Sequence, residues 1–307
     1  MVGVLIGFAI IGVIIGLGYL IGRSGMLGSR ADFPLSRLAF FVLTPALVFT
    51  VLAEADLPRL FSTQLPIAGL AAVASFALAG VFSILRRRSV AETTIAALGA
   101  GYVNGNNIGI PVSVYVLGDA SASIPVVLLQ MIVFAPIALT ILDLATSGTP
   151  SLRRILLQPV RNPLIIASVL GVAVAASGLE IPEPVLAPIH LVAGAAIPVI
   201  LLNFGMSLHG RRVLAAESPR ADILVVTLIK VAVMPVAAWL LAWLVFGLDG
   251  PELFAAVALA TLPAAQNVFN YAQRYAVAET LARDVVLLTS ALSVPALFVV
   301  AALLAPA

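Results

Sequence analysis

The sequence of 307 residues contains no cysteine and only two histidines, and charged residues make up only 10% of it. Without cysteine there is no disulfide framework, thiolate zinc site or cysteine nucleophile. A soluble domain usually carries about 25% charged residues, so this composition excludes a soluble globule. The 16 basic and 14 acidic residues nearly balance and gather on no basic face, which excludes nucleic acid as a partner.

Hydrophobic residues, in contrast, make up 62% of the sequence. That much apolar surface can be buried only in a lipid bilayer, where one helical span takes about 20 residues. Apolar runs between charges and Pro or Gly breaks predict ten spans. The first run has no basic residue before it, which favours a retained span over a cleaved signal peptide. The predicted spans cover residues 2–22, 33–53, 64–85, 90–118, 124–145, 162–179, 184–208, 221–247, 252–277 and 284–304.

Arginine is distributed unevenly among the predicted loops. Fourteen of the fifteen arginines lie in odd-numbered loops or, like Arg37 and Arg274, at the span ends that border them, whereas Arg59 lies in an even-numbered loop. Short cytoplasmic loops retain Lys and Arg, so this distribution places the odd loops in the cytoplasm and both termini outside the cytoplasmic (inner) membrane.

Ten spans with both termini on one side divide into two sets of five, and the odd number inverts the second set. Pro45 and Pro198 are 153 residues apart, and Pro111 and Pro263 are 152 apart. These similar offsets favour inverted repeats over residues 1–150 and 151–307. The predicted fold is therefore an all-α membrane protein of ten transmembrane helices in two inverted five-helix repeats.

The fourth predicted span contains the least membrane-like stretch of the chain. Residues 99–111 include three Asn and four Gly and end at Pro111. Gly costs a helix interior about 1 kcal/mol and Pro about 3 kcal/mol, so the helix is predicted to unwind between Asn104 and Pro111. Irregular backbone at that depth requires enclosing protein or a water-filled cavity. A kinked helix whose amides join neighbouring helices is the alternative.

The ninth predicted span contains a similar stretch in which amides follow Pro263. Gln266, Asn267 and Asn270 lie there, and the two Asn share one helix face. Two broken helices of opposite direction would bring half-helix N-termini, near Pro111 and Pro263, to the middle of the membrane. Each N-terminus has unpaired N–H groups and about half a positive charge, so the pair would attract an anion or a carboxylate.

Other residues inside the spans have two open interpretations. Lys230, the only lysine, either contacts the anion or compensates the carbonyl ends of the broken helices. Gln130 and Asn203 either face the substrate or form hydrogen bonds between helices. The first span contains small-residue pairs typical of close helix packing: Gly3/Gly7, Gly12/Gly16 and Gly18/Gly22.

The sequence contains few residues that could form the active site of an enzyme. His190 and His209 lie apart without acidic neighbours, so the sequence predicts no metal site, and it contains no phosphate-binding loop for ATP. We expect no cofactor. A proton antiporter built on buried carboxylates is also disfavoured, because the following acids lie near span ends: Glu54, Asp56, Asp119 and Asp143.

Three motifs resemble the auxin efflux carrier family in its short bacterial form, within the bile acid, arginine and auxin transporter group. They are Asn104-Gly-Asn-Asn-Ile-Gly-Ile-Pro111, Pro263-Ala-Ala-Gln-Asn267 and Lys230-Val-Ala-Val-Met-Pro235, and the resemblance covers nearly the whole chain. The long central hydrophilic loop of the plant members is missing here, so their loop-based regulation is not carried over.

The resemblance implies that spans four and nine cross at their breaks. Asn104 or Asn107, Pro111, Pro263 and Asn267 would form this crossing, and Gln130 would face the substrate. It also implies an elevator-like movement of a transport domain, spans three to five and eight to ten, against a scaffold of spans one, two, six and seven that commonly dimerises. The substrates of the family include indole acetate in plants and small carboxylates such as malate or malonate in bacteria.

We therefore expect a secondary carrier of a small organic anion that works in the lipid bilayer as a monomer or a scaffold-linked homodimer. A sodium-coupled symporter of the same fold is one alternative. A non-transporting sensor or assembly subunit is another, although the chain has no soluble output domain. An enzyme is the least expected class. The predicted substrate-binding residues are Asn104, Asn107, Pro111, Gln130, Lys230, Pro263, Gln266, Asn267 and Asn270.

Overall fold

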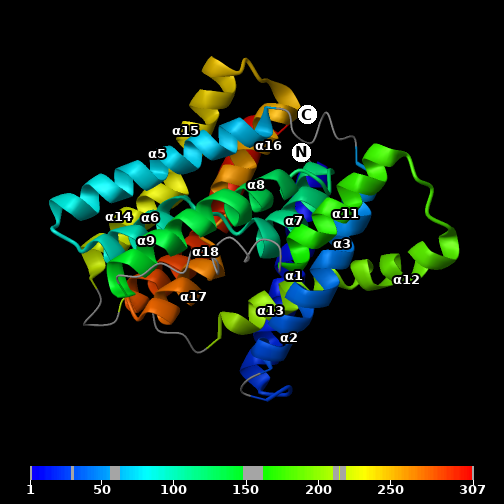
Figure 1. Cartoon of the computed structure of the whole chain (residues 1–307), viewed down its shortest axis with the longest axis horizontal. Coiled ribbons are helices and arrows are strands. Elements are labelled where there is room, and N and C mark those ends of the chain that lie inside the picture. Colours follow the sequence, from blue (N-terminus) through cyan, green and yellow to red (C-terminus); the bar gives the residue numbers. More distant parts are fainter. Residues whose placement is uncertain are drawn as a thin grey trace.

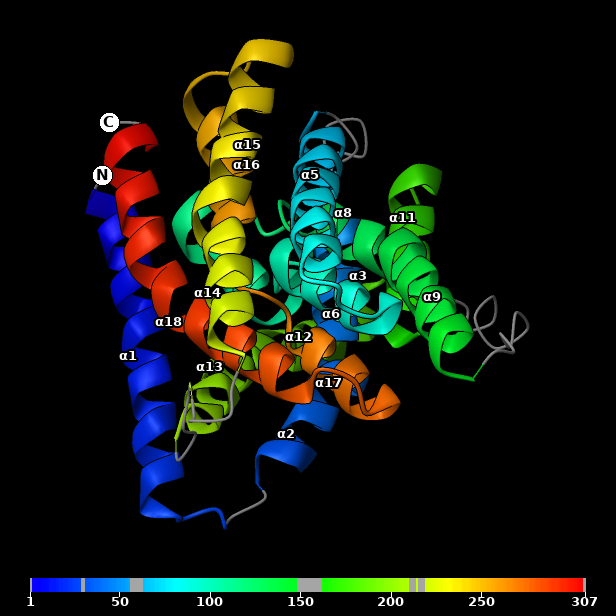
Figure 2. The same ribbon diagram turned by 90° about the vertical axis from the view of Figure 1, so that its left-hand side faces the viewer.

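The computed structural model describes residues 2–28, 31–55, 63–147, 162–209, 214 and 219–305. Within these ranges every regular element is a helix (Figure 1). The first helix begins beside the end of the last helix (Figures 1 and 2), where the rings of Phe8 and Phe298 lie 4.5 Å apart. The predicted repeat boundary and several loop residues lie outside the described residues: Arg30, Asp56, Arg59, Arg153, Arg154, Arg161, Arg211 and Arg212.

The helical elements fall before and after the segment 148–161. Those before it are α1 (Val2–Ser24), α2 (Asp32–Leu38), η1 (Ala39–Leu43), α3 (Thr44–Ala53), α5 (Gln64–Leu85), α6 (Val90–Gly101), η2 (Gly105–Gly109), α7 (Ile110–Val112), η3 (Ser113–Leu117), α8 (Ile124–Leu129), η4 (Gln130–Phe134) and α9 (Ala135–Ser147). Those after it are α11 (Pro163–Ser177), α12 (Glu183–Gly194), α13 (Ala196–Ser207), α14 (Arg220–Leu228), η5 (Ile229–Val233), α15 (Met234–Leu240), η6 (Leu241–Val245), α16 (Gly250–Thr261), α17 (Gln266–Tyr275) and α18 (Glu279–Leu304).

Seven continuous helical segments in the described part of the chain have the length and apolar composition needed to cross a membrane. They coincide with seven of the ten predicted spans. Of the other three, one is the apolar helix α11, which has 15 residues, and two are the predicted broken spans. The chain is therefore an all-helical, multi-pass membrane protein, as expected. Ten spans in inverted repeats stay a prediction.

Four elements labelled η are wide helical turns, and in each case one residue separates the end of the turn from a proline. In η1, for example, the N–H of Thr44, next to Pro45, donates to the carbonyl of Ala39, five residues back. Proline lacks the N–H of a normal turn and its ring clashes with the carbonyl four residues earlier, so a wider turn accommodates it. The helices therefore continue through their prolines. The other three pairs are η2 with Pro111, η4 with Pro136 and η5 with Pro235.

The helices pack as two groups that are visible in Figure 1. In one group, α1 packs along α13, and α3 packs on α11 and α12; these helices occupy the right and lower parts of the view. In the other, α5 packs on α6, and α18 packs on α14, α16 and α17, at the left and top. We call these the α1–α13 group and the α5–α18 group; α2 belongs to the first, and α8, α9 and α15 belong to the second.

Glycine allows the two most intimate helix contacts of the α1–α13 group. A Cβ atom at Gly18 of α1 would overlap the carbonyl oxygen of Leu202 in α13, and one at Gly205 would overlap that of Ile15. Close packing of the first helix is thus confirmed at Gly7, Gly18 and Gly22, each of which faces backbone atoms. The prediction of close packing was wrong for Gly12 and Gly16, which face open space. The surroundings of Gly3 lie outside the described side chains.

We expect a Gly18→Val substitution to lower the melting temperature of the purified protein by roughly 5–10 °C. Its Cβ must displace backbone rather than a side chain, which typically costs about 1–3 kcal/mol. Thermal unfolding in detergent measures the change. Gly16→Val, in the same helix but facing open space, is the matched control. Equal melting temperatures for the two variants would argue against a tight crossing of α1 and α13.

Candidate functional site

The first helix break lies between α6 and η2. A capping box starts α6: the Glu92 N–H donates to Ser89 Oγ over 3.2 Å, and the Ser89 N–H donates to Glu92 Oε2 over 2.9 Å. The helix ends at Gly101, residues 102–104 are non-helical, and helical structure resumes at Gly105.

The sequence-based placement of this break was wrong in one respect. Unwinding was predicted between Asn104 and Pro111, but it lies at residues 102–104 and Pro111 is inside a helical segment. The wide turn η2 accommodates the proline. The glycines serve close packing instead: a Cβ at Gly101 would lie 2.5 Å from the Phe76 ring, and one at Gly105 would lie 2.8 Å from Val127.

The second break separates α16 from α17 at residues 262–265, and it contains Pro263 as predicted. The N–H of Ala264 donates to the hydroxyl of Thr289 in α18 over 3.1 Å. That hydroxyl in turn donates to the Val285 carbonyl. A neighbouring helix therefore supplies the hydrogen bond that the broken helix lacks, as a break inside a membrane protein requires.

The two breaks contact each other directly. Val103 and Ala264 form an isolated antiparallel β-bridge. The Asn104 N–H donates to the Pro263 carbonyl over 2.8 Å, and the Ala265 N–H donates to the Tyr102 carbonyl over 2.9 Å. Residues 159 to 163 positions apart are thus joined by backbone hydrogen bonds, which fix how the two following helix starts are placed.

Those helix starts carry the amides that the sequence singled out. Asn104 caps η2, because its Oδ1 accepts the Asn107 N–H over 3.1 Å. No described side chain caps α17, so the N–H groups of its first two residues, Gln266 and Asn267, have no partner within the helix. The start of α17 therefore presents bare N–H groups and the positive end of a helix dipole.

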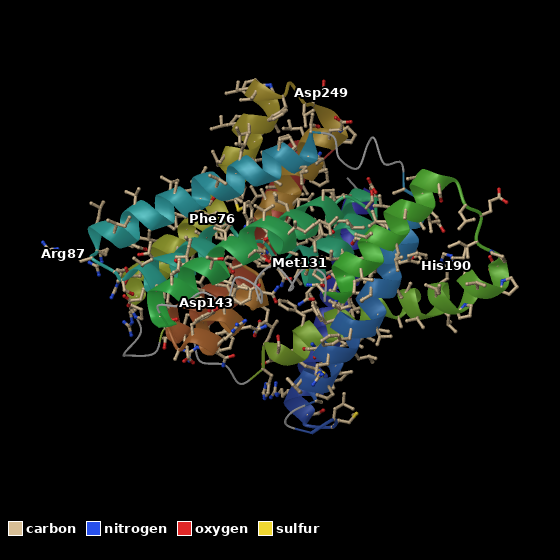
Figure 3. All side chains as sticks on the ribbon, viewed as in Figure 1. Phe76, Arg87, Met131, Asp143, His190 and Asp249 are labelled. Atoms are coloured by element: carbon tan, nitrogen blue, oxygen red, sulfur yellow. The ribbon has the colours of Figure 1, made fainter. Side chains whose placement is uncertain are left out.

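A cavity of about 620 Å³ opens beside the joined breaks, within the size range of small-molecule sites. Its walls come from both helix groups: α2, η1 and α13 form one, and the two breaks, η4 and α17 form the other. Met131, which belongs to this lining, lies near the middle of the view in Figure 3, whereas Arg87 and Asp249 lie at the edges of that view. Nine lining residues carry amides: Asn104, Asn106, Asn107, Gln130, Asn203, Gln266, Asn267, Asn270 and Gln273.

Six of the nine predicted site residues therefore line one cavity. The other three, Pro111, Lys230 and Pro263, are not among its lining residues. Pro111 lies in α7, and Pro263 contributes its carbonyl to the bridge between the breaks.

Several of the lining amides have oxygen atoms without a partner. Gln130 is 3% exposed, and its Oε1 has no hydrogen-bond partner among the described residues; the same holds for Oδ1 of Asn106 and of Asn203. The Asn106 amide donates to Asn107 Oδ1, and the Asn203 amide donates to Ser36 Oγ. A buried polar atom left unpaired costs about 1–3 kcal/mol, so such atoms indicate a place for a polar ligand or water.

Lys230 lies at the carbonyl end of α16. It is fully buried, and its Nζ donates to the Ala260 carbonyl over 2.8 Å and lies 3.2 Å from Met234 Sδ. No described carboxylate lies within ion-pair distance of it. Of the two open interpretations, this geometry favours compensation of the broken helix's carbonyl end.

Sequence reasoning missed Arg37, the one charged residue among the described lining residues. It was counted among the loop arginines, but it lies on α2 with its guanidinium carbon 5.8 Å from the Phe33 ring centre and 5.6 Å from that of Phe41. The spacing Phe33, Arg37, Phe41 is that of one helix face and could have indicated the arrangement.

Two buried carboxylates were also missed. Asp222 in α14 pairs with Arg88, whose pKa the hydrogen bond raises, and lies 3.6 Å from Arg86. Asp284 in α18 accepts hydrogen bonds from Arg283 and from the N–H of Leu214. Both carboxylates lie in the first two turns of their helices and outside the cavity lining. They therefore stabilise helix ends and do not contact a substrate in the cavity.

Comparison with known proteins gives the family. The sequence model of the family described as "Membrane transport protein" matches two stretches, residues 4–149 and 147–301. The chain is also similar to a protein of Rhizobium meliloti (strain 1021) named "Putative malonate transporter", with 28% identity over 289 residues that cover 91% of this chain and 88% of the relative. The chain therefore belongs to this family of membrane transport proteins, the auxin efflux carriers that its motifs resemble, and is a transporter rather than an enzyme.

Proposed function

We propose that this protein is a secondary carrier of a small carboxylate in the cytoplasmic membrane. The observation that carries the proposal is the amide-lined cavity beside the bare N–H groups at the start of α17. N–H groups and amide donors hold a negative charge without a buried cation, and amides cost far less than ions to keep in a membrane. The relative named for malonate supports a carboxylate as the substrate.

The packing of the helices supports an elevator-type mechanism. The α5–α18 group carries both breaks and would move as the transport domain, whereas the α1–α13 group would form the scaffold. The cavity lies where the two groups meet, so a sliding movement would carry the bound substrate past a fixed wall. The match of the family model in two stretches supports two related halves. Termini outside the cell and a dimer through the scaffold stay predictions.

A sodium-coupled symporter is the second candidate, because the unpaired amide oxygens of Asn106, Gln130 and Asn203 in the cavity could serve as ligands of a sodium ion. Backbone carbonyls at the breaks are less available to such an ion, since those of Tyr102, Asn104 and Pro263 already accept hydrogen bonds. An uptake assay with sodium replaced by potassium separates the two mechanisms.

The test is uptake of labelled malonate by purified protein in liposomes. Asn107→Ala and Asn267→Ala each remove an amide from the cavity, so we expect uptake to fall about tenfold or more while membrane insertion and the melting temperature change little. Gln64→Ala is the control, since Gln64 bonds the Glu252 carbonyl outside the cavity. Wild-type uptake by both cavity variants would overturn this site, and a wild-type protein that takes up no carboxylate would overturn the function.

A further inference from the structure

We propose that Arg37 binds a second carboxylate of the substrate and thereby makes the transporter prefer dicarboxylates over monocarboxylates. This inference rests on the proposed function and adds a substrate class to it. Arg37 contributes from α2, on the wall that the α1–α13 group forms, whereas the bare N–H groups of α17 lie on the other wall. A substrate with a negative charge at each end can therefore contact both walls.

The charge of Arg37 is available to a ligand. Among the described lining residues there is no carboxylate, and no described acid lies within ion-pair distance of the guanidinium. No described residue accepts a hydrogen bond from the side chain of Arg37. A guanidinium carries five donors in a planar fork, and two of them match the two oxygens of a carboxylate.

Two aromatic rings lie close to the guanidinium of Arg37. The rings of Phe33 and Phe41, one turn before and after it, both lie within 6 Å of its central carbon. The neighbouring Ser36 accepts a 2.8 Å hydrogen bond from Asn203, which joins α2 to α13. An arginine that served only to orient the protein in the membrane would need neither contact. A cation–π contact uses none of the guanidinium N–H groups as hydrogen-bond donors, so these stay free for a carboxylate.

In the described lining of the cavity, Arg37 is the residue that can neutralise a second carboxylate of the substrate. The nine amides and the start of α17 can satisfy one carboxylate, but they offer no full positive charge. Lys230 does not serve this role, because it is committed to the Ala260 carbonyl. A second carboxylate would therefore depend on Arg37, whereas a monocarboxylate of the same carbon skeleton would not.

The experiment compares acids that differ only in one carboxylate. Uptake of labelled malonate into liposomes is inhibited with unlabelled malonate or propionate, and with succinate or butyrate as a longer pair. We expect wild type to bind the dicarboxylate of at least one pair more tightly. In Arg37→Gln, inhibition by that dicarboxylate weakens about tenfold to hundredfold and inhibition by the monocarboxylate is unchanged. Arg37→Lys keeps the charge without the fork and is expected to be intermediate.

Arg274→Gln is the matched control, because Arg274 also stacks on an aromatic ring, 5.2 Å from the centre of Tyr275, and does not line the cavity. An Arg37→Gln protein that keeps the wild-type preference, or that loses both acids of a pair equally, overturns the role of Arg37 and leaves the carrier intact. A wild-type protein that takes up no carboxylate overturns the carboxylate carrier and the role of Arg37 together. The melting temperature of each variant shows whether it is folded.

Discussion

We expect a Gln130→Leu substitution to reduce carboxylate uptake by about tenfold to hundredfold without lowering the melting temperature. Gln130 lies in the wide turn η4, lines the cavity and is 3% exposed, so its amide is held in place rather than free in solvent. A hydrogen bond to a charged ligand is worth about 1.5–3 kcal/mol, which corresponds to the expected loss of uptake.

Most substitutions of buried residues lower the melting temperature, but Gln130→Leu should not. The Oε1 atom of Gln130 is buried without a partner, so the native protein already carries the cost of an unpaired polar atom. Leucine removes that atom and keeps a similar volume, and the melting temperature should hold or rise. Uptake kinetics and thermal unfolding measure the two effects. Gln64→Leu, outside the cavity, controls for the loss of an amide. A variant with normal uptake, or one that unfolds several degrees earlier, would contradict the assignment.

The helices could be predicted from the sequence because a bilayer leaves the backbone little choice. Each apolar run must satisfy its own N–H and C=O groups, so run length alone predicts a span. The break in the ninth span was also placed correctly, since Pro263 itself lies in the non-helical segment. In the fourth span the same reasoning failed. The helix was predicted to unwind between Asn104 and Pro111, but the non-helical residues are 102–104 and the wide turn η2 accommodates Pro111.

Some residues of the candidate site could also be predicted from the sequence, and others could not. The amides could be found because a polar side chain inside an apolar run is costly and therefore conspicuous. Arg37 was overlooked, because an arginine near a helix end already has a sufficient explanation in membrane orientation, and only its helix-face spacing with Phe33 and Phe41 pointed to another role. Only the packing of α2 against α13 places it in the cavity wall. For Lys230 the sequence suggested the carbonyl end of a broken helix as one of two partners, and the structure identifies the carbonyl as that of Ala260, 30 residues later in the chain.

The second large effect concerns Lys230, for which we expect Lys230→Glu to yield no folded protein. The side chain is fully buried, and its Nζ donates to a carbonyl in the last turn of α16, the negative end of that helix dipole. Glutamate replaces the donor with an acceptor at the same place and buries a charge of the wrong sign, and an unpaired buried ion costs several kcal/mol. Detergent extraction followed by size-exclusion chromatography should show aggregate or no protein.

Lys230→Met is the variant that separates the structural role from contact with substrate. Methionine fills a similar volume but leaves the Ala260 carbonyl without its donor, a loss of about 1–3 kcal/mol that relief from burying an ammonium partly offsets. The protein should fold with a modestly changed melting temperature and with an unchanged KM for the carboxylate, because Lys230 does not line the cavity. A stable Lys230→Met protein whose KM rises tenfold would instead place the ammonium on the substrate, and a soluble, monodisperse Lys230→Glu protein would remove the need for a cation at the end of α16.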